Sequence, residues 1–336
     1  MPTGDDGVRA GAAGDLEARR RGGVGPAVPV AARALRALTE TGEPHRSGLV
    51  ALAGRPNAGK STLVNRLVGE HVVAVSSRPQ TTRRRALGAV RGPGWQMVLV
   101  DLPGVQKPFD RLTERMQRSV EETLADADAV VLMLNGPEGV GPGDRHIAAT
   151  VLRPGAPPCL IAINKVDRMR PNEIAQVIAA AAELGEFHAI HPISARTGDG
   201  VDALAADLAA LMPEGPAYFP EGVSTDQTAE QRIAEAIREA ALEALRQEVP
   251  HAVAVLVEEI SRGRKGVTVV QASVICETQS QKRILVGSGG AMIRGIGTAA
   301  RPLVEQIVGG PVFLDLTVKV RPKWRRDEAE LDRLGI

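Results

Sequence analysis

The chain has 336 residues, which suits two domains of ordinary size, and its 43% hydrophobic content argues against global disorder. Because 41 Lys and Arg residues balance 40 Asp and Glu residues, the formal net charge is only +1, which excludes a polybasic or polyacidic chain. Aromatic residues make up 2% of the sequence, so binding of nucleic acid on a platform of stacked aromatic rings is disfavoured. Both cysteines, Cys159 and Cys276, lie in apolar runs far apart in the sequence and are expected to be buried thiols.

Four segments of different composition follow one another. Residues 1–45 are rich in Gly, Ala and Arg and are expected to be a disordered extension. Residues 46–212 and 229–336 are predicted to be two domains, joined by a Pro/Gly-rich linker at 213–228. The net charge is −4 for residues 48–249 and +4 for residues 250–336. A polyanion is therefore expected to bind the C-terminal part of the chain.

The first domain alternates short apolar runs with helical patterns. Strands are expected at 49–53, 97–100, 129–134, 160–163 and 189–193, and helices near 61–69, 111–125, 143–152, 172–184 and 201–211. Apolar strands that are separated by helices predict an α/β fold, with a mostly parallel sheet and helices on both faces. The second domain is expected to begin with a helix near 228–248, followed by strands at 252–260 and 267–275, a helix at 291–308 and a strand at 312–320.

A phosphate-binding loop opens the first domain. The motif G-x-x-x-x-G-K-[ST] is matched in full by Gly54, Arg55, Pro56, Asn57, Ala58, Gly59, Lys60 and Ser61, and Thr62 is counted with them as nucleotide-binding. The motif follows a strand and precedes a helix, as such a loop must. Its backbone N–H groups can surround phosphate oxygens, Lys60 can place its charge on the β- and γ-phosphates, and Ser61 can ligate Mg²⁺.

A second motif predicts which base is read. Asn164, Lys165 and Asp167 follow the strand at 160–163, and Ser194, Ala195 and Arg196 follow the next one. The carboxylate of Asp167 can accept hydrogen bonds from the ring N–H and the exocyclic amine of guanine, a donor pair that adenine lacks. We expect Asn164 to tie its loop to the phosphate loop, Lys165 to cover the base and Ser194–Arg196 to close the pocket.

The loops between these motifs predict the catalytic residues. Asp101, Leu102, Pro103 and Gly104 end the strand at 97–100, where the carboxylate can hold a Mg²⁺-bound water and the Gly104 N–H can sense the γ-phosphate. Thr82 lies in the preceding loop and can complete the Mg²⁺ shell, so Lys60, Thr82, Asp101 and Gly104 form the predicted catalytic set. The basic run Arg83–Arg85 beside Thr82 is expected to be solvated surface or an RNA contact.

The C-terminal domain contains a second glycine-rich loop. Gly287, Ser288, Gly289 and Gly290 stand between helical segments, and Lys282, Arg283 and Arg294 flank them. Strands, a helix–GxxG–helix unit and a further strand are similar to a KH domain, in which glycines let an RNA backbone approach and bases lie in an aliphatic groove. Such a module agrees with the shortage of aromatic residues.

Taken together, the motifs resemble those of the Era family of ribosome-associated GTPases over about residues 46–336. The resemblance implies a P-loop GTPase domain followed by a type II KH domain, with GTP or GDP and Mg²⁺ bound. It also implies small-subunit ribosomal RNA and the small ribosomal subunit as partners, near the 3′ end of that RNA. A monomer in the cytoplasm is expected, and a peripheral contact with the cell membrane is left open.

Departures from the family pattern bear on mechanism. Leu102 stands where the family usually has Thr, and Ser288 replaces a Lys in the GxxG loop, which removes one charge from the RNA contact. Val105, by contrast, differs from Ras-like enzymes, which have a water-orienting Gln at that position, so hydrolysis is expected to be slow, on the order of 10⁻⁴ to 10⁻² s⁻¹. The resemblance suggests that K⁺ held by Asn57 supplies the missing charge.

Two interpretations remain open at this point. One is a GTP-hydrolysing switch that acts in small-subunit assembly, and the other is a nucleotide-gated RNA-binding scaffold in which hydrolysis is incidental. A P-loop kinase that uses ATP is a third class, which Asp167 disfavours.

Overall fold

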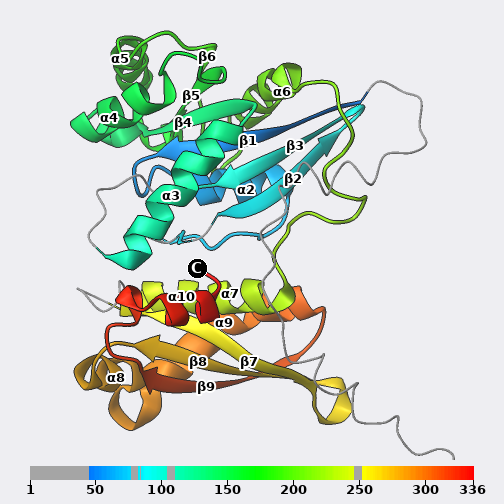
Figure 1. Cartoon of the computed structure of the whole chain (residues 1–336), viewed down its shortest axis with the longest axis vertical. Coiled ribbons are helices and arrows are strands. Elements are labelled where there is room, and N and C mark those ends of the chain that lie inside the picture. Colours follow the sequence, from blue (N-terminus) through cyan, green and yellow to red (C-terminus); the bar gives the residue numbers. More distant parts are fainter. Residues whose placement is uncertain (1–44, 77–81, 84, 104–109, 246–251) are drawn as a thin grey trace, which may run out of the picture. The chain divides into compact units, whose positions relative to one another are not determined.

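The structure is a computed structural model that describes the chain except for residues 1–44, 77–81, 84, 104–109 and 246–251. The expected N-terminal extension therefore lies almost entirely outside the described residues. Residues Thr41–Ile336 form one compact unit, and its described part contains a six-stranded sheet and a three-stranded sheet (Figure 1).

The six-stranded sheet carries the phosphate-binding loop. Its strands are β1 (Arg46–Gly54), β2 (Ala86–Gly92), β3 (Trp95–Asp101), β4 (Ala129–Asn135), β5 (Cys159–Asn164) and β6 (Ala189–Pro192). The strand order is β2-β3-β1-β4-β5-β6, and only β2 runs antiparallel to its neighbour. The four central strands of this order end at the same edge, which collects the predicted nucleotide-binding loops.

Helices cover both faces of this sheet, as the sequence predicts. They are α2 (Lys60–Val68), α3 (Arg111–Asp126), α4 (Pro142–Val151), α5 (Pro171–Ala182) and α6 (Val201–Leu211). Leu63 of α2 and Leu204 of α6 share one core with Leu52 and Met133 of the sheet. The alternate strand residues, such as Leu132 and Ile161, are also fully buried, because α3, α4 and α5 contact the strands from the other face.

The three-stranded sheet belongs to the C-terminal domain. Its elements are α7 (Ala229–Ala244), β7 (Ala254–Arg262), β8 (Thr268–Cys276), α8 (Gln279–Val286), α9 (Ala291–Val308) and β9 (Val312–Val320). β7 and β8 are antiparallel, whereas β8 and β9 are parallel. The apolar faces of α7 and α9, with Ile237 and Ile296, pack on the sheet at Val270 and Val274. Cys276 lies in the same core and Cys159 is buried in β5, so both thiols are buried as expected.

The segment predicted as a linker is hydrogen-bonded along the edge strand β2. Ala89 donates its backbone N–H to Ser224 O, and Leu87 N–H donates to the Asp226 carboxylate. On the neighbouring strand β3, the Gln96 side chain exchanges two hydrogen bonds with the backbone of Phe219. This segment therefore has a fixed path beside the sheet, and it covers an edge that would otherwise be open.

The last residues form a short helical segment that the sequence patterns did not predict. It comprises a 3₁₀ turn (Trp324–Arg326) and α10 (Glu328–Leu334). Trp324, Leu331 and Leu334 form a buried cluster with Ala254 and Ile275 of the second sheet and with Leu112 and Met116 of α3. No helix in the described parts of the chain has the length and apolar character of a membrane span.

Candidate nucleotide site and RNA-binding loop

The phosphate-binding loop joins the end of β1 to the start of α2. Its Gly59 has φ +101°, and a Cβ there would lie 2.1 Å from the Asn164 side-chain nitrogen, so only glycine fits. Asn57 has φ +62°, a left-handed conformation that asparagine tolerates. The buried Lys60 ammonium donates to the carbonyl oxygens of Gly54 (3.0 Å) and Arg55 (3.1 Å). The lysine is thereby held inside the loop where phosphates would lie.

The side chain of Asn164 joins the two other nucleotide loops. Its amide nitrogen donates to Ala58 O at 2.8 Å, and its oxygen accepts from Ala195 N at 2.9 Å. Asn164 is 3% exposed, so both hydrogen bonds are shielded from solvent. The Lys165 ammonium also reaches the phosphate loop, at Asn57 O (2.8 Å). The structure thus brings together the residues that the two separate motifs contribute.

The predicted guanine reader, Asp167, has a partner on each carboxylate oxygen. Ser194 Oγ donates to one oxygen at 2.7 Å, and the Arg196 guanidinium donates to the other at 2.5 Å. The Ser194 hydrogen bond, followed by that of Arg196, lowers the pKa of Asp167, so the carboxylate stays ionised at neutral pH. An ionised carboxylate at this position can accept two hydrogen bonds from guanine.

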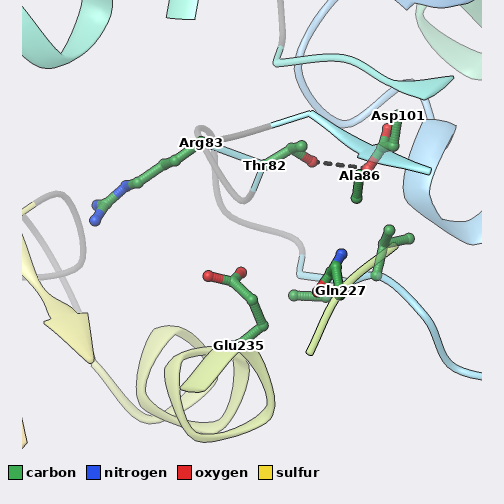
Figure 2. A pocket seen from close by; sticks show the side chains of 8 residues that line it. Thr82, Arg83, Ala86, Asp101, Gln227 and Glu235 are labelled. Carbon is green, nitrogen blue, oxygen red and sulfur yellow. Dashed lines mark hydrogen bonds between the residues drawn. The ribbon is translucent and has the colours of Figure 1, made fainter. Parts of the chain in front are cut away.

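Three oxygen atoms meet where Mg²⁺ is expected. Thr82 Oγ1 donates to Asp101 Oδ2 at 2.9 Å (Figure 2). Ser61 Oγ donates to the same oxygen at 2.7 Å, and the two hydroxyls lie 3.2 Å apart. The other Asp101 oxygen is buried and has no hydrogen-bond partner in the described part of the chain. Burial raises the pKa of Asp101, opposed by Lys60, and a cation beside the carboxylate would lower it. Hard oxygen donors and an unpaired buried carboxylate oxygen fit Mg²⁺.

The remaining predicted residues lie around this core of the site. Leu102 and Pro103 are buried directly after β3, whereas Gly104, like Val105, falls outside the described residues. Thr62 lines an open cavity of about 390 Å³ together with Ala195 and Arg196. The Arg55 side chain forms ion pairs with Glu138 (3.3 Å) and Asp144 (3.4 Å), and its carbonyl oxygen accepts from Lys60.

Two arginines with structural roles at the site were not identified from the sequence. Arg66 of α2 donates through Nε to Ala195 O at 3.2 Å and also bonds Arg196 O, so it supports the loop that closes the base pocket. Arg83 was expected to be solvated or to contact RNA, and this is wrong: the residue is 5% exposed and donates to Val253 O. Arg85, two residues on, is exposed. Only the tertiary contacts distinguish these arginines from ordinary surface cations.

The GxxG loop connects α8 to α9. Gly287 has φ +69°, and a Cβ there would lie 2.8 Å from Met292, so this turn requires glycine. Ser288 and Gly289 are exposed, and Arg283 and Arg294 extend from the flanking helices with their side chains exposed. Within the described residues, neither these arginines nor Lys282 forms an ion pair. The cations are therefore available to phosphates, and the exposed Ile284 beside them offers an apolar surface.

Comparisons with known proteins agree with this division of the chain. A family model described as "50S ribosome-binding GTPase" matches residues 49–165, and one described as "KH domain" matches residues 248–325. GTPase Era of Mycobacterium bovis (strain BCG / Pasteur 1173P2) is 44% identical over 295 residues, which are 86% of this chain and 98% of the relative. GTPase Era of Mycobacterium avium (strain 104) is also 44% identical, over 294 residues with the same coverage.

Two solved structures are similar over most of the chain. One is Era in complex with MgGDPNP and nucleotides 1506–1542 of 16S ribosomal RNA, with a TM-score of 0.83 and 35% identity, covering 87% of this chain and 99% of that one. The other is an Aquifex aeolicus Era variant bound to GDP and AlF₄⁻, with the same TM-score and identity, covering 86% and 99%. The full-length relatives, the two matched domains and the geometry of the nucleotide loops agree. The chain therefore belongs to the Era family of GTPases.

Proposed function

We propose that the protein is a GTP-hydrolysing switch that binds small-subunit ribosomal RNA through its KH domain and acts in small-subunit assembly. The observation that carries the proposal is the convergence of Ser61, Thr82 and Asp101 beside a phosphate loop that Asn164 ties to the base pocket. A binding module would not need this arrangement of hydroxyls and a carboxylate at the γ-phosphate end of the site.

Each residue has a distinct part in the proposed reaction. Asp167 reads guanine, the Lys60 ammonium balances charge on the β- and γ-phosphates, and Ser61 and Thr82 hold Mg²⁺ with Asp101 behind them. Bound there, Mg²⁺ would neutralise charge that develops on the phosphate oxygens in the transition state. On sequence grounds alone, the backbone N–H of Gly104 is proposed to donate a hydrogen bond to the γ-phosphate. Positioning and charge, not covalent chemistry, are what these groups supply.

K⁺ at Asn57 is a finer part of the proposal. Val105 cannot orient the attacking water, and a monovalent cation beside the phosphates would supply charge in the manner of an arginine finger. The left-handed backbone of Asn57, whose carbonyl is held by Lys165, gives its side chain a fixed starting point at the loop. Hydrolysis is expected to be slow, with K⁺ faster than Na⁺.

The RNA partner is proposed from the KH-type loop and from the complex of the Era relative with 16S ribosomal RNA. The description of the family model for the first domain names the 50S (large) ribosomal subunit. Binding of the protein to the large and to the small subunit therefore needs to be compared directly. We expect isolated small subunits to bind the protein in the presence of a GTP analogue and to stimulate hydrolysis. Binding to large subunits alone would contradict the assignment.

The scaffold interpretation is retained because Val105 lacks a side chain that could assist hydrolysis. GTP turnover measured in K⁺ and in Na⁺, with and without small subunits, separates the two interpretations. The switch predicts stimulation by subunits, by K⁺ or by both. Absence of stimulation under all four conditions, with RNA binding intact, would favour the scaffold.

Location and assembly state belong to the same proposal. We infer a cytoplasmic monomer, since the proposed RNA partner is cytoplasmic. A peripheral membrane contact rests on the family resemblance alone, and cosedimentation of the protein with vesicles of anionic lipid tests it.

A further inference from the structure

Two consecutive residues of the loop before β2 point in opposite directions. Thr82 turns toward Asp101 and the proposed Mg²⁺ position, whereas Arg83 extends away from it toward the C-terminal domain (Figure 2). Opposed neighbours are the normal consequence of an extended backbone. Here Thr82 faces the reaction site, and Arg83 contacts the C-terminal domain on the opposite side of the loop.

The Arg83 guanidinium is inserted among residues of the C-terminal domain. It donates to Val253 O at 2.6 Å, just before β7, and its Cζ lies 5.5 Å from the ring centroid of Trp324. Trp324 is fully buried and is itself fixed, since its indole N–H donates to Ala252 O at 3.0 Å. A guanidinium over an indole face is an attractive arrangement. The residue next to Thr82 is therefore held by buried, hydrogen-bonded groups of the other domain.

Charged groups from several elements surround Arg83. Glu235 and Asp110 attract it, whereas Arg238 and Arg325 repel it. Burial and Arg238 lower the pKa of Arg83 to about 9, which still leaves it protonated at neutral pH. A charge taken out of water is tolerated only while its hydrogen bonds and partners are in place. Partial withdrawal would leave this charge buried with fewer partners, so the side chain is expected to be either fully inserted or fully released.

Mg²⁺ coordination tolerates only small displacements of its ligands, so the position of Arg83 affects whether Thr82 can bind the ion. Mg²⁺ requires its oxygen ligands at about 2.0–2.1 Å in nearly ideal geometry, and adjacent Cα atoms are only about 3.8 Å apart. A backbone shift of about 1 Å at Arg83 would therefore remove the Thr82 hydroxyl from a coordinating position. Trp324 also shares a buried cluster with Leu112 and Met116 of α3, the helix that comes next in the sequence after Asp101. Arg83 and α3 are thus both associated with the buried cluster around one tryptophan.

We propose that Arg83 is a positioning residue for GTP hydrolysis, whose insertion between Val253 O and Trp324 keeps Thr82 at the Mg²⁺ site. The inference rests on the proposed function. Through this contact, the arrangement of the C-terminal domain sets the hydrolysis rate. Arg83 touches neither nucleotide nor metal and acts only through its neighbour.

Arg83→Met in the full-length protein tests the proposal, because methionine keeps an unbranched apolar stem and loses both the charge and the donor to Val253 O. Arg85→Met is the matched control: it removes the same charge two residues away from an exposed position. We expect Arg83→Met to lower kcat for GTP about 10- to 100-fold, as a displacement of about 1 Å does, with KM and GDP affinity within about twofold of wild type. The control should leave all of these quantities unchanged.

Mg²⁺ titration provides a measure that does not depend on turnover. Thr82 is proposed to ligate Mg²⁺ only when a γ-phosphate is present. The Mg²⁺ concentration that half-saturates the complex with a non-hydrolysable GTP analogue should therefore rise about fivefold or more in Arg83→Met, and that of the GDP complex should not. An equal loss of Mg²⁺ affinity in both complexes, or none in a folded variant, would overturn the proposal.

A conservative variant covers the case in which Arg83→Met does not fold. Arg83→Lys keeps the charge but cannot both donate to Val253 O and cover the indole face. It should show the same selective loss for the GTP-analogue complex, reduced to about two- to fivefold, and wild-type values would refute the role of Arg83. A wild-type protein that fails to bind or hydrolyse GTP would contradict the proposed function instead, so the two failures are distinguishable.

Discussion

The nucleotide site and the GxxG loop are two polyanion sites built in different ways. Around the phosphate loop, Asn164, Asp167 and Asp101 are connected to neighbouring loops by hydrogen bonds that are formed among the protein's own groups. Around the GxxG loop, by contrast, Arg283 and Arg294 are exposed and have no ion pair with a described residue. The first site is preorganised, so its specificity is strict. The second supplies charge and backbone access, so its affinity should depend on salt and change in small steps.

The largest effect should come from Asp167→Asn. Two charged hydrogen bonds to guanine, each of about 1.5–3 kcal/mol, would be lost or mismatched, so GTP affinity should fall by about 10²- to 10⁴-fold. Xanthosine triphosphate should become the preferred ligand, since the asparagine amide can donate to its additional carbonyl. Competition between the two nucleotides measures this exchange. The exposed Asp202→Asn serves as control, and an equal loss in both variants would show that Asp167 does not read the base.

Asn164→Ala should have the next largest effect. It leaves Ala58 O and Ala195 N without their partner, at about 1–3 kcal/mol for each buried group. We expect a lower thermal midpoint and GDP binding weakened by about 10- to 100-fold, whereas Asn172→Ala on an exposed turn of α5 should change neither. Because the loops form one network, Asn164→Ala combined with Asp167→Asn should cost less than the two single losses together. Strict additivity would contradict a preorganised site.

Arg294→Gln should reduce RNA affinity modestly and independently of the nucleotide. Loss of one phosphate contact to single-stranded RNA lowers the slope of log affinity against log salt by about 0.7 and the affinity by roughly fivefold at low salt. Arg145→Gln, an exposed change on α4, is the control. Salt titrations with an RNA of the small-subunit 3′ end measure both quantities. Adding Lys282→Gln should double the change in slope, and a cooperative collapse of binding would contradict the open construction of this site.

Ser288→Lys should have the smallest effect, and its sign is opposite. A lysine at this exposed loop position adds one cation to the RNA-facing surface, so affinity should rise about two- to threefold and the salt slope should steepen by about 0.7. GDP affinity should be unaffected. A decrease in RNA affinity would indicate that the serine makes a specific contact that the charge argument omits.

The same contrast explains what the sequence could predict. The nucleotide loops were found because each lies at the end of a strand, as Asn164 ends β5, and the network among them follows from the parallel sheet. The edge strand β2 was missed because Gly88 and Gly92 interrupt its apolar pattern. Arg83 was misinterpreted because nothing local distinguishes it from Arg85. Its burial depends on Val253, about half the chain away, and on Trp324, which lies farther still along the sequence.

The path of residues 219–226 beside β2 has a practical consequence for dividing the protein. Ser224 and Asp226 in this segment bond the outer backbone edge of a strand that begins directly after the Thr82 loop. A GTPase fragment ended at Met212 would expose that edge, and free edges pair with other chains. It should self-associate and bind GTP analogues poorly, whereas a fragment extended to Gln227 should remain dispersed. The apparent linker is therefore needed to keep the first domain soluble. The best place to separate the two domains lies just before α7.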